Sequence, residues 1–530
     1  MRVVHLEPRA PGAPSLYELV AAADPVDSLR AVSVIERERA AFSALVREVG
    51  SVVVDPTLHA FDEDQIGSLD RIHLSLDEPG ALTLSTPINP PPPSLPAGFS
   101  RHGSIRLEDR CLREIDGVSA DICVALPSLD TASTIGGVLR SAVEGVRRFF
   151  PGSRALFVNT DSGSADDTQQ AFRAVGDELA ARHPEYAFVS TLQQGIRPGK
   201  GVGVRTGMTI AHTVGTRAYL ALDTDIENPD PTWVSALLGP ILEGSAWFTL
   251  PMSPQHKDVG DISRVLLTPL VAALYGPVVF RPLSGRTAYS GEAVAELLGP
   301  EHDWSGRVTQ YGVEISIVTH AAAHSWPTAQ PRIGQVLHPS RNFPSMAQMV
   351  GQVTQTLFRR IVDTSSAWLE RSETYVPPVV PGTRVDGPLI APPDPRGLGG
   401  IRAWIAQLWQ ENRPIYRRAL SDETRVRLSH AIASAVKDDL PDFPDELWAR
   451  VVYEFALAYR RGVAGEVGEE AFGLAMMAPL LAQSVTFFCH ASGFDSAADL
   501  LAAKRAAFVA EKPRFVDQWR AIEYAAEETG

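Results

Sequence analysis

The sequence predicts an α/β protein in which a mostly parallel sheet forms the central block, with an α/β extension before it and a helical region after it. Three observations support this prediction. Short apolar runs alternate with helical stretches through the middle of the chain, which is typical of repeated βαβ units. Beyond Ile401, apolar residues recur at spacings of three and four, as they do in amphipathic helices. Pro-rich stretches at residues 87–96 and 375–400 separate these blocks.

The separators divide the chain into four predicted segments. In order, we expect an N-terminal extension with a Pro-rich linker near residues 87–96, an α/β domain, a Pro/Gly-rich linker and a helical domain. Their predicted bounds are residues 1–117, 118–372, 373–400 and 401–530. Within the extension, residues 26–49 have a helical pattern, and residues 71–86 show a weak alternation that predicts one or two strands.

The α/β domain is expected to contain four strands of a parallel sheet. The apolar runs that predict them lie at residues 122–126, 155–159, 186–192 and 218–222. Helical stretches follow the first three runs at residues 134–148, 168–182 and 204–214. Because the carboxyl ends of parallel strands meet at one edge of a sheet, we expect a ligand site where polar loops follow these strands.

The composition describes a folded, acidic protein. The chain has 530 residues, of which 45% are apolar, and 63 acidic against 48 basic residues give a net charge of −15. Such a chain can bury a large core, and its acidity argues against non-specific nucleic-acid binding. Its three cysteines form no CxxC pair, which fits a cytoplasmic protein. We interpret the uncharged residues 471–489 as a buried helix, not as a membrane span.

Two aspartates, Asp223 and Asp225, follow the fourth apolar run with one residue between them. Carboxylates at a strand end can turn towards one divalent cation, and such hard oxygen ligands suit Mg²⁺ or Mn²⁺. The alternative is a solvated turn in which an aspartate caps the next helix. The position at the end of a βα strand favours the metal-binding interpretation.

Two polar loops complete the same predicted edge. In residues 197–201, glycines allow the backbone to approach a ligand and Lys200 supplies a charge for a phosphate, although the spacing is not that of a Walker loop. A simple helix-entry loop is the alternative. In residues 159–168, helix capping explains Asp166 or Thr168, whereas a carboxylate such as Asp161 could accept a hydrogen bond from a nucleotide base.

Seven segments in order and spacing resemble the GT-A glycosyltransferases, above all the glucosyl-3-phosphoglycerate synthases, with the mannosylglycerate synthases as more distant relatives. The segments are residues 126–130, 161–168, 198–201, 223–229, 282–285, 311–315 and 338–342. The resemblance spans residues 120–360, which is less than half of the chain. It implies that the α/β domain has the Rossmann-like GT-A fold.

The resemblance also implies an activity and a set of site residues. The activity is a metal-dependent, retaining transfer of a hexose, expected to be glucose, from a UDP- or GDP-sugar to a small acceptor, with Mg²⁺ or Mn²⁺ as cofactor. The implied catalytic residues are Glu314, Asp225 and Lys200, and the implied metal ligands are Asp223, Asp225 and His338. The implied nucleotide-sugar contacts are Pro127, Leu129, Asp130, Asp161, Gly199, Lys200, Asp223 and Thr224. The implied acceptor contacts are Asp261, Ser263, Ser284, Gly285, Arg286 and Asn342. We further expect a homo-oligomer without nucleic-acid or membrane partners.

Two positions depart from the family's pattern, and both bear on the acceptor. Asp261 stands where the family has a phosphate-clamping arginine, and Arg286 stands where it has the glutamate of a Ser-Gly-Glu motif. Like charges facing each other in a site oppose binding. We therefore predict a small hydroxylated acceptor, such as a glycerate-like acid or a secondary metabolite, in place of 3-phosphoglycerate. An alignment slip of a few residues is the alternative at Asp261.

Two other functions stay open as alternatives. A sugar nucleotidyltransferase also uses a nucleotide-binding sheet and Mg²⁺, but residues 126–130 lack its GxGxR-type loop. A catalytically degenerate scaffold would not need the intact group of Asp223, Asp225 and His338. Separately, His320 and His324 form an i,i+4 pair without the glutamate of an HExxH motif, so we interpret them as a structural or chance pairing.

Overall fold

The computed structural model describes most of the chain beyond residue 104 and three short stretches before it. The described residues are 73–76, 82–85, 99–102, 105–192, 199–256, 262–338, 343–382, 389–390, 398–492 and 494–529. The chain divides into two units. They are Met1–Arg101 with Gln194–Arg197, and His102–Gln193 with Pro198–Gly530. The α/β block and the helices after it therefore belong to one unit.

The first unit contributes a pair of short strands. These strands, β1 (His73–Leu76) and β2 (Leu82–Ser85), pair antiparallel. They confirm the strands predicted within residues 71–86. The helix predicted at residues 26–49 and the Pro-rich linker near residues 87–96 lie outside the described residues.

An eight-stranded sheet forms the centre of the second unit, in the order β12-β11-β9-β10-β8-β5-β6-β7. Its strands are β5 (Ile122–Ser128), β6 (Ala155–Asp161), β7 (Tyr186–Leu192), β8 (Ala218–Leu222), β9 (Phe248–Thr249), β10 (Arg286–Ser290), β11 (Thr328–Pro331) and β12 (Val379–Val380). Two short strands precede them in the chain, β3 (Phe99–His102) and β4 (Ile105–Glu108). The four predicted strands correspond to β5 to β8, which pair parallel in the order β8-β5-β6-β7.

Strand β10 is the exception to the parallel pattern. It runs antiparallel to both of its neighbours, β8 and β9, and its first residue, Arg286, lies opposite Leu222, the last residue of β8. Because the two strands run in opposite directions, the turn that enters β10 lies beside the polar residues that leave β8. This neighbourhood brings two distant sequence segments into one site.

Helices cover both faces of the sheet. Those of the α/β block are α5 (Asp109–Ile115), α6 (Ile135–Phe149), α7 (Thr168–Arg182), α8 (Lys200–Val214), α9 (Thr232–Leu242), the π-helix η1 (Ser263–Leu267), α10 (Thr268–Tyr275), α11 (Gly291–Leu298), the 3₁₀-helix η2 (Gly306–Thr309), α12 (Val313–Ala323), α13 (Phe343–Asp363) and α14 (Ser365–Trp368). Alternate residues of β5 serve the two faces: Ile122 and Val124 pack with the core beneath α6, α7 and α9, whereas Cys123 and Ala125 pack towards α8 and α10. Burial on both faces explains why the first four or five residues of β5, β6 and β8 are apolar without alternation.

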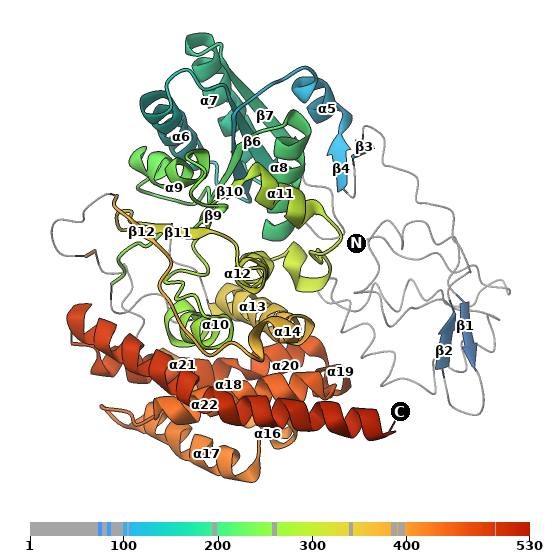
Figure 1. Cartoon of the computed structure of the whole chain (residues 1–530), viewed down its shortest axis with the longest axis vertical. Coiled ribbons are helices and arrows are strands. Elements are labelled where there is room, and N and C mark those ends of the chain that lie inside the picture. Colours follow the sequence, from blue (N-terminus) through green and yellow to red (C-terminus); the bar gives the residue numbers. More distant parts are fainter. Residues whose placement is uncertain are drawn as a thin grey trace, which may run out of the picture. The chain divides into compact units, whose positions relative to one another are not determined.

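The predicted helical region follows the sheet. It comprises α15 (Leu398–Glu411), α16 (Arg413–Ala419), α17 (Asp422–Lys437), α18 (Asp445–Arg460), α19 (Val463–Val467), α20 (Glu469–Ala475), α21 (Met477–His490) and α22 (Phe494–Thr529). Of these, α18, α20 and α21 contact α13, and α22 contacts α10 (Figure 1), so the region shares a core with the α/β block. Trp448 of α18 is fully buried, and its indole Nε1 donates to the carbonyl of Val265 in η1 at 2.6 Å. The bounds of the four predicted segments stay a prediction.

One stretch within the described residues, Glu469–His490, has the length and composition of a membrane-spanning helix. In the fold it is built as α20 and α21, and 83% of its apolar window is buried inside the protein. The burial agrees with the sequence-based interpretation of residues 471–489 as a core helix.

Candidate active site

The polar residues predicted to bind a ligand gather at the carboxyl edge of the parallel strands. Asp223 and Asp225 follow β8, Ser128 ends β5 and Asp161 ends β6. In open α/β sheets this edge is the usual position of a ligand site. The chain topology therefore places the candidate residues where the sequence pattern predicted them.

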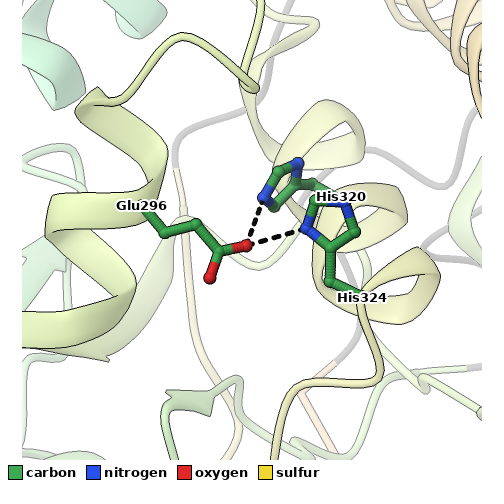
Figure 2. Close-up of side chains that lie close together, drawn as sticks. All are labelled: Glu296, His320 and His324. Atoms are coloured by element: carbon green, nitrogen blue, oxygen red, sulfur yellow. Dashed lines mark hydrogen bonds and ion pairs between the residues drawn. The ribbon is translucent and has the colours of Figure 1, made fainter.

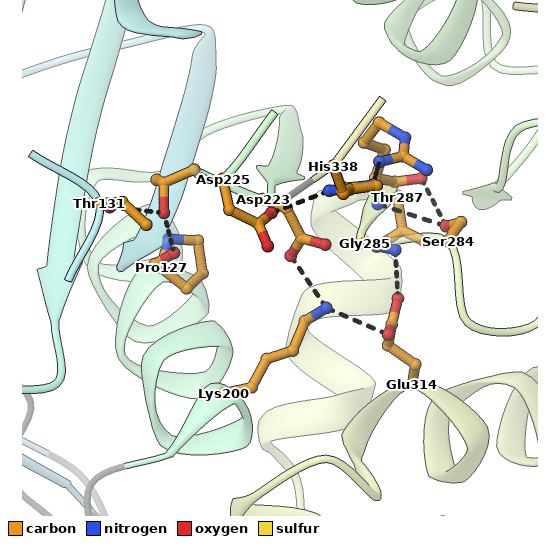
Figure 3. A network of polar contacts seen from close by, with 12 residues as sticks. Pro127, Thr131, Lys200, Asp223, Asp225, Ser284, Gly285, Thr287, Glu314 and His338 are labelled. Carbon is orange, nitrogen blue, oxygen red and sulfur yellow. Dashed lines mark hydrogen bonds and ion pairs between the residues drawn. The ribbon is translucent and has the colours of Figure 1, made fainter. Parts of the chain in front are cut away.

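Lys200 links two carboxylates at the centre of this edge (Figure 3). Its Nζ lies 2.9 Å from Asp223 Oδ1 and 3.2 Å from Glu314 Oε2. The three side chains are 12–19% exposed, so the ion pairs are shielded from bulk water but still reachable from solvent. Lys200 is the first residue of α8, and Glu314 lies in the first turn of α12, where the helix dipole favours a negative charge.

Glycines explain how the first turn of α8 can lie so close to η2. A Cβ on Gly201 would lie 1.9 Å from the carbonyl oxygen of Val308, and one on Gly199 would lie 2.7 Å from that of Thr309. The predicted helix began at residue 204, whereas α8 begins at Lys200. The glycines that lowered the helical signal are needed for this close packing.

Gly285 fixes the positions of Asp223 and Glu314 from the other side. Its amide donates to Glu314 Oε1 at 2.6 Å, and its carbonyl accepts from the amide of Asp223 at 2.8 Å. Gly285 has a positive φ of 66°, and a Cβ there would lie 1.6 Å from Asp223 Oδ2. No other residue type fits this position without moving the aspartate.

Asp225 and His338 form a second contact beside the first. His338 Nδ1 lies 3.0 Å from Asp225 Oδ1, and His338 Nε2 lies 3.2 Å from Arg286 Nη1. An arginine can only donate, so Nε2 of His338 accepts and Nδ1 carries the proton given to Asp225. The two predicted metal ligands thus meet across 113 residues of sequence.

Arg286 is a fully buried cation in this group. Its side chain is 0% exposed, and among the described residues its Nε and Nη2 find no hydrogen-bond partner. Burial lowers the pKa of the Arg286 guanidinium, and three nearby carboxylates, with Asp223 first, oppose that shift. The guanidinium also lies 6.0 Å from the centre of the Trp233 ring.

The loops predicted to hold the nucleoside are tightly bonded to each other. Asp161 is 0% exposed, and its carboxylate accepts from the amides of Gly163 and Ser164 and from the hydroxyls of Ser128 and Ser164. Asp130 has a positive φ of 52° and accepts from the amide of Ala165. Base recognition by Asp161 stays a prediction, because the bonds in this structure hold the loop together.

The remaining predicted contacts are two on the donor side, two on the acceptor side and two that the structure does not describe. Leu129 is 55% exposed at the rim, whereas Thr224 donates from its hydroxyl to the carbonyl of Pro127. Ser263 begins η1 and is buried, and the Ser284 hydroxyl donates to the carbonyl of Arg286 within their own turn. Asp261 and Asn342 lie outside the described residues.

A small pocket is lined both by residues predicted to contact the sugar donor and by a residue predicted to contact the acceptor. Its lining includes Pro127, Lys200, Asp223, Gly285 and Glu314. Thr287 and Tyr289 of β10 also line it and were not among the predicted site residues. Thr131 is a further unpredicted neighbour, with its hydroxyl 3.1 Å from that of Thr224. Single threonines and a tyrosine carry no spacing signal, so only the antiparallel strand and the loop packing reveal them.

Fold and site together have the features of a glycosyltransferase-type α/β enzyme, and comparison with known proteins agrees. No family model matches the chain. The glucosyl-3-phosphoglycerate synthase of Mycobacterium tuberculosis (strain CDC 1551 / Oshkosh) is 29% identical over 259 residues, which are 45% of this chain and 73% of the relative. The enzyme of the same name from Mycolicibacterium smegmatis is 29% identical over 253 residues, or 45% and 77%. These relatives confirm the predicted resemblance and the predicted enzyme class, a glycosyltransferase.

Solved structures of a protein with the same name are also similar to this chain. A crystal structure of glucosyl-3-phosphoglycerate synthase from Mycobacterium tuberculosis with Mn²⁺, UDP-glucose and phosphoglyceric acid is 26% identical, covers 47% of this chain and 81% of its own, and has a TM-score of 0.37. A second structure, with Mg²⁺ and UDP, is 25% identical, covers 48% and 82%, and has the same TM-score.

Proposed function

We propose that this chain is a metal-dependent, retaining glycosyltransferase that moves a hexose, glucose in the first instance, from a nucleoside-diphosphate sugar to a small hydroxylated acceptor. The observation that supports it most is the group of Lys200, Asp223 and Glu314 beside Asp225 and His338. These residues come from four separate segments, and they meet at the carboxyl edge of the parallel strands. The curated relatives, which are glycosyltransferases, support the same class.

The donor set around Asp225 suits a hard divalent cation. Two carboxylates one residue apart are the hard oxygen ligands that Mn²⁺ and Mg²⁺ prefer. The imidazole of His338, already in contact with Asp225, would add a nitrogen ligand that Mg²⁺ accepts less readily than Mn²⁺. Asp225, His338 and Asp223 would hold the ion. When bound, it would neutralise charge that builds on the leaving diphosphate.

The chain's own groups would complete the site. Lys200 supplies a second positive charge for the diphosphate, and it is held in place by Asp223 and Glu314. Glu314 is fixed by the Gly285 amide, so its carboxylate can orient sugar or acceptor hydroxyls without searching for a rotamer. The apolar lining of the pocket, which includes Val204 and Ile317, limits access of competing water.

The acceptor in this proposal is not 3-phosphoglycerate, although the relatives' name contains it. Two charge changes support this part: an aspartate at position 261 where the family has an arginine, and the buried Arg286 where it has a glutamate. An acidic side chain repels a phosphate, and the buried cation of Arg286 changes the charge balance beside Asp223 and Glu314. A glycerate-like acid without the phosphate is the simplest compound that meets both changes.

Donor binding tests the class. Calorimetric titration with UDP, GDP and their glucose and mannose conjugates, each with Mg²⁺, with Mn²⁺ and with chelator, should identify one base that binds only when metal is present. Asp225→Asn should abolish this metal-dependent binding and the slow hydrolysis of the donor. Asp177→Asn, on the exposed side of α7, is the matched control and should behave as the wild type. Unchanged turnover in Asp225→Asn would remove Asp225 from the metal site.

A second measurement tests the acceptor. With the preferred donor, product formation is followed by mass spectrometry for glycerate, 3-phosphoglycerate and a panel of small hydroxylated acids. We expect at least one acceptor to be used more efficiently than 3-phosphoglycerate. Equal or better use of 3-phosphoglycerate would refute this part and leave the transferase class standing.

A further inference from the structure

Away from the active site, a glutamate from one helix meets two histidines from the next. Glu296 lies in the last turn of α11, while His320 and His324 lie one turn apart at the end of α12 (Figure 2). Glu296 Oε1 is 3.0 Å from His320 Nε2 and 2.7 Å from His324 Nδ1. One ligand atom from each of the three residues lies within 4.8 Å of the other two. A carboxylate from another helix, α11, thus joins the two histidines as a third possible ligand.

A single carboxylate oxygen is the focus of this cluster. Besides the two imidazoles, the indole Nε1 of Trp326 donates to Glu296 Oε1 at 3.1 Å. An oxygen with two lone pairs is thus approached by three nitrogen atoms. Two neutral imidazoles can satisfy it only if each carries its proton on the nitrogen that faces the carboxylate. A cation between them would instead use the lone pairs of both rings.

We propose that Glu296, His320 and His324 form a second divalent-cation site, which selects Zn²⁺ and is completed by water. Two imidazoles and one carboxylate with an open fourth position are a ligand set that zinc prefers. Zinc bonds of about 2.0–2.1 Å arranged tetrahedrally put neighbouring ligand atoms about 3.3 Å apart. The observed separations need to widen by only a few tenths of an ångström, which small side-chain rotations supply.

The surroundings of the cluster suit a held ion. His320 is fully buried and packs between the rings of His302 and Trp326, which fixes its orientation. His324 is 37% exposed, so the site has an opening through which a hydrated ion can enter. The Trp326 hydrogen bond orients the carboxylate, as outer partners of metal ligands do.

The position of the site indicates a structural role. The ion would fasten the end of α11 to the end of α12, and the first turn of α12 carries Glu314. The cation would brace the helix that positions Glu314 without contacting the reacting groups. The site is separate from Asp223, Asp225 and His338, so it can be tested with those residues disabled.

The test uses the full-length chain with Asp225→Asn, which removes the other expected metal site. After chelator treatment, Zn²⁺ is titrated and the bound metal is counted by mass spectrometry. Co²⁺ is used as a visible-light probe of tetrahedral coordination. We expect one equivalent of Zn²⁺ and intense tetrahedral Co²⁺ bands. Adding His324→Gln should weaken Zn²⁺ binding by about 100-fold or more, because one of three protein ligands is lost.

The matched control is Glu292→Gln. This variant removes an exposed carboxylate from the first turn of α11, the helix that carries Glu296, and should leave Zn²⁺ binding unchanged. In chelator, the His324→Gln variant should unfold at or below the parent's temperature, because it loses the hydrogen bond to Glu296. Added Zn²⁺ should raise the unfolding temperature of the parent alone. Absence of stoichiometric Zn²⁺ in the Asp225→Asn chain would overturn the proposal. Equal binding with and without His324 would do the same.

Discussion

At the scale of single residues, Arg286 has the most unusual environment in the candidate site. It is a buried cation that contacts His338, which is also the imidazole expected to bind the metal. Burying a charge is costly unless its partners are good, and two of its nitrogens have none among the described residues. The guanidinium supplies part of the positive charge that Asp223, Glu314 and Asp225 would otherwise take from a bound ion, so we expect it to compete with the metal.

Replacing Arg286 tests this competition. In Arg286→Met the side chain keeps a similar apolar length but loses its charge, so a cation no longer repels the metal and His338 Nε2 is freed. We expect Mn²⁺ to bind about tenfold tighter or more at low ionic strength, measured by calorimetry with UDP present. Arg332→Met, at an exposed position, is the control for simple loss of charge. Unchanged or weaker Mn²⁺ binding would contradict the prediction.

The positions of residues that lie in strand-end motifs could be predicted from the sequence, whereas their roles stay a prediction. The apolar pattern of β8 and the helical pattern of α8 are clear in the sequence. Two aspartates, Asp223 and Asp225, follow β8, and Lys200 begins α8, so parallel-strand geometry places all three at one edge of the sheet. Glu296 could not be found in this way, because nothing in the sequence shows which face of α11 turns towards α12. Asp161 was placed at the correct edge, but the bonds that occupy its carboxylate depend on loop conformation, which motifs do not specify.

At the scale of elements, the turn before β10 sets the geometry of two carboxylates. Gly285→Ala would place a methyl group on Asp223 and force a positive φ on alanine. We expect the strain to cost about 1–3 kcal/mol of unfolding free energy and donor turnover to fall about 100-fold or more, because Asp223 and Lys200 separate. Denaturation curves and donor hydrolysis measure the two effects.

Gly244→Ala is the control for this turn. Gly244 also has a positive φ, of 74°, but nothing lies within 4 Å of its added Cβ. It should lose similar stability and keep full turnover. Equal loss of turnover in both variants would show that backbone strain, not displacement of Asp223, is responsible.

The contact between α18 and η1 joins the helical region to the α/β block. Trp448→Phe removes the indole donor and leaves the buried carbonyl of Val265 without its hydrogen bond. We expect a loss of about 1–3 kcal/mol in unfolding free energy, measured by urea denaturation. Tyr524→Phe on α22 removes a polar group from an exposed aromatic residue and should change little. A loss below that of the control would mean that this contact contributes no stability.

The order and type of the elements from β5 to β8 were largely predictable from the sequence. Strands that are buried on both faces are strongly apolar, and the helices that connect them are amphipathic. Strand β10 was not predicted. Its five residues, RTAYS, mix polar and apolar types, and its burial comes from β8 and β9 on either side. Tertiary pairing, not local propensity, makes this segment a strand.

At the scale of the whole molecule, the two halves of the second unit share a hydrophobic cluster, while a second cluster lies beneath α6, α7 and α9. The shared cluster of buried side chains includes Cys111 and Cys123 near the sheet and Trp448 and Phe515 in the C-terminal helices. Surfaces that are buried together usually unfold together. The protein is therefore expected to lose its α/β block and its helical region in one transition.

The cysteines report on this cooperativity. Burial raises the pKa of the Cys111 thiol to about 12 and raises that of Cys123 as well, so neither forms the reactive thiolate near neutral pH. In the native chain we expect an alkylating reagent to modify only Cys489, which is partly exposed. In increasing urea, Cys111 and Cys123 should become reactive at the midpoint of the circular-dichroism transition. Reaction of Cys123 at lower urea would show that the sheet opens independently.

The antiparallel placement of β10 has a consequence for how this enzyme could change its substrates. Residues 284–286 lie beside Asp223, so a substitution that reshapes the acceptor side also alters the group expected to hold the metal and the donor. Donor and acceptor preference are then mutationally coupled, and the effect of a change at one position depends on the residue at the other. Directed evolution towards a new acceptor would have to vary this turn and the β8 aspartates as a single unit, because improvements selected separately would not combine.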